Sequence, residues 1–534
     1  MGTRREARPI TLAVTPGQPR LAWHGNEVAP APAAKITVTE RVGAGPVAGR
    51  IIDADDNLAA LHALAAEGLT GGVDLVYIDP PFMAGGDREA AQGSAMAYRD
   101  TWPGGLDGYL DMLRARLLAI RPLLAATGNL FVHLDWHAVH YVKVLLDELL
   151  GAANFRNEIV WRRANAHSDP ARFGVITDAI LFYGASARAH WADVHVPYEP
   201  RYVASHWRRS DARGRYRLIP LDAPRHGDGG NLVYPWRGKL PAASRTWAIG
   251  REAMEALERD GLIVYTASGT PTRKRYLADS PGLRAQNLWD DIPPVNPMAA
   301  ERLGYPTQKP VALLERIIAA ACPPGGLVLD AFAGSGTTLE AAERLGRRWI
   351  GVDSNPAAVQ LARRRLLALA GQPGRTTVKT AYRECERCRQ ISLHGRGTRG
   401  PAIVPRAFTV ERVGPPTITG HDDEPRVVID VGDGLARVQL QGSLAAVAAW
   451  SVDWEFVAPV FVGGTHMLRP RRGPIAGAAE HVYAQGGART IAVQVVRDSG
   501  AVARVLLPVV VQGPSTGPIA ETSGPGCHLP GRAP

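Results

Sequence analysis

The sequence predicts an α/β protein whose main domain is a doubly wound, mostly parallel sheet of the Rossmann type, followed by a smaller all-β domain. Residues 73–78 (VDLVYI) are almost continuously apolar, which is typical of a parallel strand buried on both faces. Segments with strand and helix periodicity then alternate along the chain. After residue 400, short β-type runs are separated by Gly, Pro and Asp, a pattern that predicts a separate sandwich.

The elements of the main domain, expected over residues 49–370, follow from this alternation. Residues 1–48 are rich in Pro, Ala and Gly, and we expect an irregular lead-in. The regularity is interrupted by an insert at about 162–295, where Arg, Trp and Tyr accumulate. The predicted helices cover residues 58–69, 106–124, 139–150, 310–321 and 337–345, and the predicted strands cover residues 73–78, 129–134, 326–332 and 347–353.

The C-terminal part divides into three expected segments. Residues 371–400 are polar and rich in Arg and Gly, which predicts a linker, and residues 514–534 are rich in Gly, Pro and Ser, which predicts a disordered tail. Between them, residues 401–513 are the expected sandwich. The order of VDWEFV, HVYAQGG and TIAVQVVRDSG in this stretch resembles immunoglobulin-like domains of the PKD type.

The composition excludes several classes of protein. No stretch approaches the roughly 18 apolar residues of a membrane-spanning helix, and the N-terminus lacks the plan of a secretory signal. Four cysteines imply no disulfide framework, so we expect a cytoplasmic protein. The 61 Lys and Arg against 51 Asp and Glu give a net charge of +10. This basic balance favours a polyanionic partner, although coding from GC-rich DNA explains it equally well.

One motif predicts a nucleotide-type ligand. In DAFAGSGTTLEAAERLGRRWIGVDSNP (330–356), a strand ends at Asp330, Gly334 and Gly336 allow a tight turn, and a helix follows. Asp353 closes the next strand about 20 residues later, where an acidic side chain suits a ribose diol. The third glycine of a dinucleotide fingerprint is missing, and the turn carries no basic group for a pyrophosphate. A ligand with a ribose but no phosphate, such as S-adenosylmethionine, fits better.

A second motif, Asp79-Pro80-Pro81-Phe82, stands at the end of the strand over residues 73–78. The prolines stop the strand and leave carbonyl acceptors free beside a carboxylate and an aromatic face. An exocyclic base amine needs such a site, because its lone pair is conjugated into the ring and is freed when acceptors hold its two hydrogens. Asp79 and the Pro80 carbonyl are the expected acceptors, and Phe82 is expected to stack on the base. Taken alone, the motif is also compatible with a proline-stopped strand and a core Phe.

Together these motifs resemble the β class of DNA amino-methyltransferases, in which the catalytic motif precedes the cofactor turn in a permuted order. Further similarity lies in Asp55, Asn57 and Leu58, in residues 98–102 (YRDTW), in NFRNEIVW at 154–161 and in YPTQKP at 305–310. The resemblance covers roughly residues 50–370 and is nearest to the methyltransferase subunits of type III restriction-modification systems.

The resemblance implies an S-adenosylmethionine-dependent, site-specific enzyme that methylates a base flipped out of double-stranded DNA. The implied catalytic residues are Asp79, Pro80, Pro81 and Phe82, and the implied cofactor residues are Asp330, Phe332, Gly334, Gly336, Asp353, Thr307, Gln308, Lys309 and Pro310. Asp79 in first place favours the N6 amine of adenine. An N4-cytosine enzyme and a catalytically silent DNA-recognition subunit are the alternatives. A restriction subunit and a second copy of the chain are further candidate partners.

The segment over residues 201–217 is the expected DNA-binding part of the insert. It interleaves arginines with aromatic residues, and such side chains contact phosphates and bases. The alternative is a solvated basic loop. The residues assigned to DNA binding are Arg201, Trp207, Arg208, Arg209, Arg213 and Arg215.

Two groups of metal-ligand residue types carry weaker signals. Cys385 and Cys388 have zinc-knuckle spacing, but a structural zinc site needs four ligands and no fourth is apparent, so we expect an ordinary turn or the remnant of a zinc ribbon and no metal. His133 and His137 are expected in a loop near the site rather than as catalytic bases.

Overall fold

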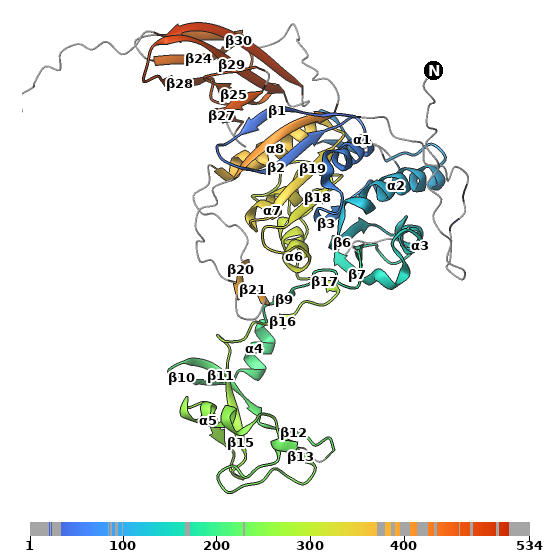
Figure 1. Cartoon of the computed structure of the whole chain (residues 1–534), viewed down its shortest axis with the longest axis vertical. Helices are drawn as coiled ribbons and strands as arrows, with labels where there is room; N and C mark the ends of the chain where they lie inside the picture. Colours follow the sequence, from blue (N-terminus) through green and yellow to red (C-terminus); the bar gives the residue numbers. More distant parts are fainter. Residues whose placement is uncertain are drawn as a thin grey trace, which may run out of the picture.

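The computed structural model describes residues 21, 23, 34–83, 85, 88–90, 94–98, 100–165, 171–227, 230–370, 380–385, 390–395, 406–413, 426–431, 435–458, 460–469, 474–497 and 501–511. The α/β domain lies in the middle of the molecule (Figure 1). The C-terminal β-sandwich lies at one end of the long axis, and a small domain formed by residues 199–280 lies at the other end.

The predicted α/β architecture is confirmed. Within the described residues, eleven strands form one mixed sheet, whose central strands are parallel. In spatial order they are β17 (Leu288–Trp289), β7 (Phe155–Arg162), β8 (Thr177–Gly184), β6 (Leu124–Leu134), β3 (Val73–Ile78), β18 (Leu327–Asp330), β19 (Arg348–Asp353), β2 (Val47–Asp53), β22 (Ala407–Val413), β1 (Ile36–Val42) and β26 (Phe461–Gly463).

Helices cover both faces of this sheet because successive strand residues point to opposite faces. In β3, Val76 and Ile78 join one apolar layer, whereas Leu75 and Tyr77 join the other. The first layer contains α1 (Asn57–Leu64), α2 (Leu106–Ile120) and α3 (Val139–Leu150). The second layer contains α6 (Val311–Ala321), α7 (Thr337–Arg344) and α8 (Pro356–Ala370).

The sheet order brings the two sequence motifs together. β3, which precedes Asp79, pairs in parallel with β18, which ends at Asp330 and leads into the glycine turn. β19, which ends at Asp353, lies on the other side of β18. Because the strands are parallel, their carboxyl ends meet at one edge of the sheet, where α/β proteins bind ligands. A short hairpin, β4 (Arg88–Ala90) and β5 (Ser94–Tyr98), follows the catalytic motif along the chain.

The structure corrects several expected boundaries. Residues 36–42 form β1 instead of part of an irregular lead-in, and β22 lies in the main sheet between β2 and β1 instead of in the sandwich. The expected linker contains β20 (Thr380–Cys385) and β21 (Gln390–Gly395), and β21 pairs with β9 (Asp193–Val196). β8, expected in the insert, is a core strand. These pairings join distant parts of the chain, so local composition does not reveal them.

Within its described residues, the small domain contains two antiparallel sheets and two α-helices. One sheet contains β10 (Arg209–Asp211), β11 (Gly214–Pro220), β15 (Pro271–Tyr276) and β14 (Ile263–Tyr265), and the other contains β12 (Asp222–Pro224) and β13 (Arg245–Trp247). The helices are α4 (Pro200–His206) and α5 (Arg251–Arg259). A compact apolar core that includes Trp236, Trp247 and Met254 holds the domain together. The short strand β16 (Leu283–Arg284) returns the chain to β9.

The C-terminal sandwich has two antiparallel sheets around a shared apolar core that includes Trp450 and Trp454. Its strands are β23 (Arg426–Val431), β24 (Leu435–Gln441), β28 (Ala478–Val482), β27 (Thr465–Leu468), β25 (Val447–Asp453), β29 (Gly487–Arg497) and β30 (Val502–Val511). The sandwich also contributes β26 to the edge of the main sheet. Among the described residues, no helix combines the length and apolarity that crossing a membrane requires.

Candidate active site

A cavity of about 470 Å³ opens at the carboxyl edge of β3, β18 and β19. It unites the two sequence motifs with the segment Tyr305–Lys309. Its lining includes all four residues of the catalytic motif and most of the expected cofactor residues, namely Asp330, Phe332, Gly334, Asp353, Thr307, Gln308 and Lys309. Asn57 and Arg116 complete one wall.

Two expected cofactor residues do not line this cavity. Gly336 has a left-handed backbone, and a Cβ there would lie 2.7 Å from the Cβ of Ala362 in α8. Pro310 is buried at the start of α6, where it is the N-cap residue. Both residues therefore shape the backbone around the cavity instead of contacting its contents.

The strand end at Asp79 is tightly organised. Oδ2 of Asp79 accepts a hydrogen bond of 2.5 Å from Nζ of Lys309, which lies 230 residues away in the sequence. Oδ1 of Asp79 is buried and has no hydrogen-bond partner among the described residues. Beyond the prolines, Met83 has a positive φ of 59°, and its N–H donates to the buried carboxylate of Asp100 at 2.7 Å. The hydrogen bond to Asp100 thus fixes the backbone that follows Phe82, while Oδ1 of Asp79 remains available as an acceptor.

Phe82 rests against a buried polar chain. Its ring stacks on that of His133 with centroids 5.8 Å apart and 26° between the planes. Nδ1 of His133 lies 2.9 Å from the Tyr77 hydroxyl, and Nε2 lies 3.1 Å from Oδ2 of Asp178. Burial tends to raise the pKa of Asp178, but the hydrogen bond with His133 and the charges of His133, Lys309 and Arg163 together lower it.

His133 was therefore wrongly expected in a loop. It is fully buried in β6, directly below the aromatic ring of the catalytic motif. The sequence signal for this position was its place in an apolar strand next to β3, one residue before the last residue of that strand. His137 does lie in the following turn, where its ring nitrogen is 2.7 Å from Asp135.

The glycine turn is held by two carboxylates, of which Asp330 is buried and Asp353 is half-buried. Asp330 accepts hydrogen bonds from the Phe332 N–H at 2.9 Å and from the Thr338 hydroxyl at 2.5 Å. Asp353 accepts one from the Gly334 N–H at 2.7 Å. Burial raises the pKa of Asp330 to about 7 and that of Asp353 to about 6. A ligand that carries positive charge and hydroxyl donors would stabilise both carboxylates.

The cations in the cavity wall are already engaged. Lys309 binds Asp79, and Arg116 donates to Asn57 at 2.6 Å and to Asp56 at 2.6 Å. The lining that the structure describes therefore offers no unpaired cation for a phosphate. Its residues fit a cationic ligand that contains a ribose but no phosphate, which is the chemistry of S-adenosylmethionine.

A second cavity, of about 410 Å³, adjoins the first. The two cavities share Phe82, Tyr305 and the segment Thr307–Lys309. The outer wall of the second cavity contains Trp161, Arg163, Asp178, Pro294, Val295 and Arg302. Phe82 and Lys309 therefore lie between two compartments, and Asp79 lines the first of them beside Lys309, an arrangement that suits transfer between two bound molecules.

The insert separates the expected DNA-binding residues into two groups. Arg201, Arg208, Arg209 and Arg215 are exposed, and none has an ion-pair partner within the part of the chain that the structure describes. Arg213 instead pairs with Asp279 at 2.9 Å. The expectation for Trp207 is wrong, because its side chain is 1% exposed and packs under the guanidinium of Arg217. It is a core residue of the small domain and does not face solvent.

Two large aromatic side chains of the α/β domain are exposed to solvent. Trp136 is 45% exposed and lies in the turn after β6, and the guanidinium of Arg172 lies 5.2 Å from its ring centre. Phe173, beside Arg172, is 98% exposed. The question of zinc at Cys385 and Cys388 lies outside the described residues, since no side chain is described there.

Comparison with known proteins gives one family. A family model described as DNA methylase matches residues 73–364. The type II methyltransferase M.EcaI of Enterobacter cloacae is 32% identical over 313 residues, covering 58% of this chain and 68% of its own length. The StyLTI Mod subunit, from a type III restriction-modification enzyme of Salmonella typhimurium, is 28% identical over 54% of this chain and 48% of its own length. The DNA adenine methyltransferase YhdJ of Escherichia coli is 26% identical over 58% of this chain and 80% of its own length.

Proposed function

The chain belongs to the DNA methylase family and is an S-adenosylmethionine-dependent DNA methyltransferase, and from this premise we propose that it methylates the N6 amine of an adenine flipped out of double-stranded DNA. One observation carries the proposal. Asp79 lines the first cavity, and its buried Oδ1 has no partner among the described residues, while its Oδ2 is held by Lys309, which lines both cavities. An acceptor beside the residues that the two cavities share suits an amine that enters from one cavity and faces a methyl donor in the other.

The first cavity is the proposed cofactor site. In this proposal Asp353 accepts hydrogen bonds from the ribose hydroxyls, which is supported by its position in the lining beside Phe332 and Gly334. Thr307, Gln308 and Lys309 close the opposite end. The bound cofactor supplies an electrophilic methyl group on a sulfonium.

The second cavity is the proposed compartment of the flipped base. The base stacks on Phe82, an interaction worth about 1–3 kcal/mol. The amine donates its hydrogens to Oδ1 of Asp79 and to the Pro80 carbonyl, so its lone pair is released from conjugation with the ring. The chain's contribution to rate is positioning and preorganised acceptors, and it needs no covalent enzyme intermediate. The proton that the amine loses passes to water.

We assign DNA contact to the exposed arginines of the small domain, Arg201, Arg208, Arg209 and Arg215. Each is free to neutralise a phosphate, because no carboxylate in the described structure binds it. Four further expectations stay predictions: a restriction subunit as partner, a homodimer, a PKD-like identity for the sandwich and a cytoplasmic location. The similarity to the Salmonella Mod subunit supports the first of these.

Adenine is favoured over cytosine by two observations. An Asp stands first in the catalytic motif, and a relative is named as a DNA adenine methyltransferase. The alternative is N4 methylation of cytosine by the same residues, since both amines present the same hydrogens to Asp79. The intact acceptor geometry at Asp79 argues against a catalytically silent subunit.

The test is identification of the product. Purified protein, labelled S-adenosylmethionine and mixed-sequence duplex DNA are incubated, and the DNA is digested to nucleosides for mass spectrometry. We expect N6-methyladenine from the wild type and none above background from Asp79→Ala. N4-methylcytosine would replace the adenine assignment, and equal transfer by Asp79→Ala would refute the proposed role of the carboxylate.

A further inference from the structure

Lys309 carries the next inference, because its ammonium contacts both groups that the proposed mechanism needs. Nζ of Lys309 lies 2.5 Å from Oδ2 of Asp79 and 4.8 Å from the ring centre of Phe82. The side chains of Lys309 and Asp79 are 8% and 18% exposed, so the pair is largely shielded from water. In such surroundings a charge-assisted hydrogen bond strongly restricts the orientation of a carboxylate.

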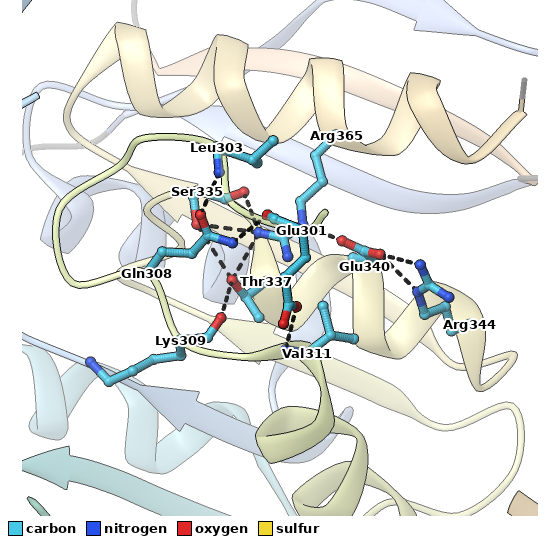
Figure 2. A network of polar contacts seen from close by, with 10 residues as sticks. All are labelled: Glu301, Leu303, Gln308, Lys309, Val311, Ser335, Thr337, Glu340, Arg344 and Arg365. Carbon is cyan, nitrogen blue, oxygen red and sulfur yellow. Dashed lines mark hydrogen bonds and ion pairs between the residues drawn. The ribbon is translucent and has the colours of Figure 1, made fainter. Parts of the chain in front are cut away.

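The backbone of Lys309 is held from several sides. The Thr337 hydroxyl donates to the Lys309 carbonyl at 3.2 Å, and Nη1 of Arg365 donates to the same hydroxyl at 2.9 Å. Glu340 binds Arg365 and also accepts from Nε of Arg344 at 2.8 Å. Figure 2 shows the Lys309 carbonyl turned toward Thr337 while its side chain extends away from this network.

The neighbours of Lys309 in the sequence are fixed in the same network. Gln308 accepts from the Leu303 N–H at 2.8 Å and donates to the Glu301 carbonyl at 2.7 Å. Oε2 of Glu301 accepts from the Val311 N–H at 3.1 Å (Figure 2). Thr307 has a positive φ of 58°, a strained conformation for a β-branched residue that the surrounding contacts must maintain. These contacts thus fix the backbone from which the Lys309 side chain extends.

We propose that Lys309 is a positioning residue for methyl transfer. Its ammonium holds Oδ2 of Asp79, so that Oδ1 faces the target amine, and it offsets the negative charge of Asp79. The inference rests on the proposed function and concerns the same site. A residue that served only to hold the cofactor would not need to contact Asp79 and Phe82 at once.

The charges around the site support this role. Asp79, Asp330 and Asp353 all line the first cavity, and Asp178 lines the second. The charge of Asp79 contributes to the raised pKa of Asp330, after the larger effect of burial. Of these four carboxylates, Asp79 and Asp178 both interact with the charge of Lys309. The ammonium therefore offsets part of the negative charge that these carboxylates concentrate around the site.

The experiment compares Lys309→Met, Lys309→Arg and the control Lys143→Met. Lys143 is a matched control because it also binds a carboxylate, at 2.7 Å in Asp147, and also lies over an aromatic ring, at 4.2 Å from the centre of Phe155, on α3 away from both cavities. We expect Lys309→Met to lower kcat about 100-fold, the scale of a misplaced reacting group. The KM for S-adenosylmethionine should stay within about threefold, Lys309→Arg should recover part of the rate, and Lys143→Met should match the wild type.

A second measurement shows whether Lys309 acts through Asp79. In the Asp79→Asn background, where no carboxylate remains to be positioned, Lys309→Met should add less than about threefold to the loss. Single-turnover rates at saturating cofactor give this value, and equilibrium cofactor binding together with thermal unfolding verifies that each variant is folded.

Two results would overturn the inference. A raised KM for the cofactor with unchanged kcat would make Lys309 a cofactor ligand only, and a Lys309→Met rate within about threefold of the wild type would leave it without a role in transfer. If the rate losses from Lys309→Met and Asp79→Asn were additive in the double variant, Lys309 would not act through Asp79. Failure of the proposed function looks different, because the wild type and Lys143→Met would then also fail to methylate DNA.

Discussion

The catalytic domain and the small domain of residues 199–280 use charged side chains in opposite ways. In the catalytic domain, Glu340 is buried between Arg344 and Arg365, and Lys309 is buried against Asp79. In the small domain, four exposed arginines lack carboxylate partners within the described structure, namely Arg201, Arg208, Arg209 and Arg215. Buried pairs fix one geometry, whereas exposed unpaired cations remain available to a polyanion.

Buried pairing also joins the sandwich to the catalytic domain. Arg363 of α8 binds Glu40 of β1 at 2.5 Å and the Ser451 hydroxyl of β25 at 3.1 Å. Gln494 of β29 donates to the same Glu40 at 3.1 Å. Buried polar groups are tolerated in such a contact only when each has a hydrogen-bond partner. The network therefore fixes how the two domains dock.

The largest effect should follow from breaking a buried network. Glu340→Ala leaves the guanidinium groups of Arg344 and Arg365 buried without their carboxylate, which should lower the free energy of unfolding by about 3–5 kcal/mol. Denaturant titration followed by circular dichroism measures the change. Glu480→Ala is the matched control, because its pair with Arg437 is about half exposed and should contribute less than about 1 kcal/mol. Equal losses in the two variants would contradict the contrast between buried and exposed pairs.

Asp330 is a buried carboxylate without a cationic partner among the described residues, so its effect on stability should depend on pH in the opposite sense to that of Glu340. Burial raises the pKa of Asp330 from 3.8 to about 7, whereas the two arginines lower the pKa of Glu340 despite its burial. Between pH 3.8 and about 7, Asp330 keeps its proton in the folded state but has lost it in the unfolded state. The stability that Asp330 contributes is therefore fully present below about pH 4 and is lost as the pH rises to about 7.

The measurement is the difference in unfolding free energy between the wild type and Asp330→Asn at several pH values. This difference should fall by up to about 1.4 kcal/mol for each pH unit from about 4 to 7 and then level off. Asn cannot ionise, so it supplies the pH-independent reference. A difference that stays constant across this range would show that Asp330 is ionised in the folded protein throughout.

The sequence predicted the parts of the site that lie next to each other along the chain. Residues 73–78 and 326–332 are apolar runs that end in polar motifs, and both form strands that meet at one edge. The contact between Lys309 and Asp79 escaped prediction, because the two residues are 230 positions apart and lysine is compatible with many surroundings. The same reason hid the buried His133, whose partners Tyr77 and Asp178 come from separate strands.

The error at Trp207 has a different origin. An aromatic residue among arginines is typical of a DNA-contacting loop, but it is equally typical of a small core that guanidinium groups cover. Only the tertiary contacts decide, and here Arg217 and Tyr198 cover the indole. The strand at β22 was misplaced for a similar reason, because strand periodicity does not say which sheet a strand joins.

The unpaired arginines should account for much of the binding to DNA. Substituting Arg208, Arg209 and Arg215 together by Ala removes three cations without breaking an ion pair in the described structure. The slope of log affinity against log salt should therefore fall by about 2.7, and affinity at low salt should weaken on the order of 100-fold. Fluorescence anisotropy with duplex DNA measures both quantities, and kcat at saturating DNA should persist. An unchanged slope would place the DNA on another surface.

The smallest effect should come from the paired arginine of the same domain. Arg213 is bound to Asp279 at 2.9 Å, and both side chains are more than half exposed. Replacing both by Ala removes one positive and one negative charge, so the salt slope should change by less than about 0.3. Loss of so exposed a pair should also shift stability by less than about 1 kcal/mol.

The informative control for that variant is Arg215→Ala alone, which removes one unpaired charge from the same small sheet and should lower the slope by about 0.9. If pairing decides which arginines reach DNA, the double substitution has less effect than the single one, although it deletes twice as many side chains. Equal loss from both would mean that Arg213 leaves Asp279 when DNA binds. The division between paired and unpaired cations would then hold for the free protein and not for the complex.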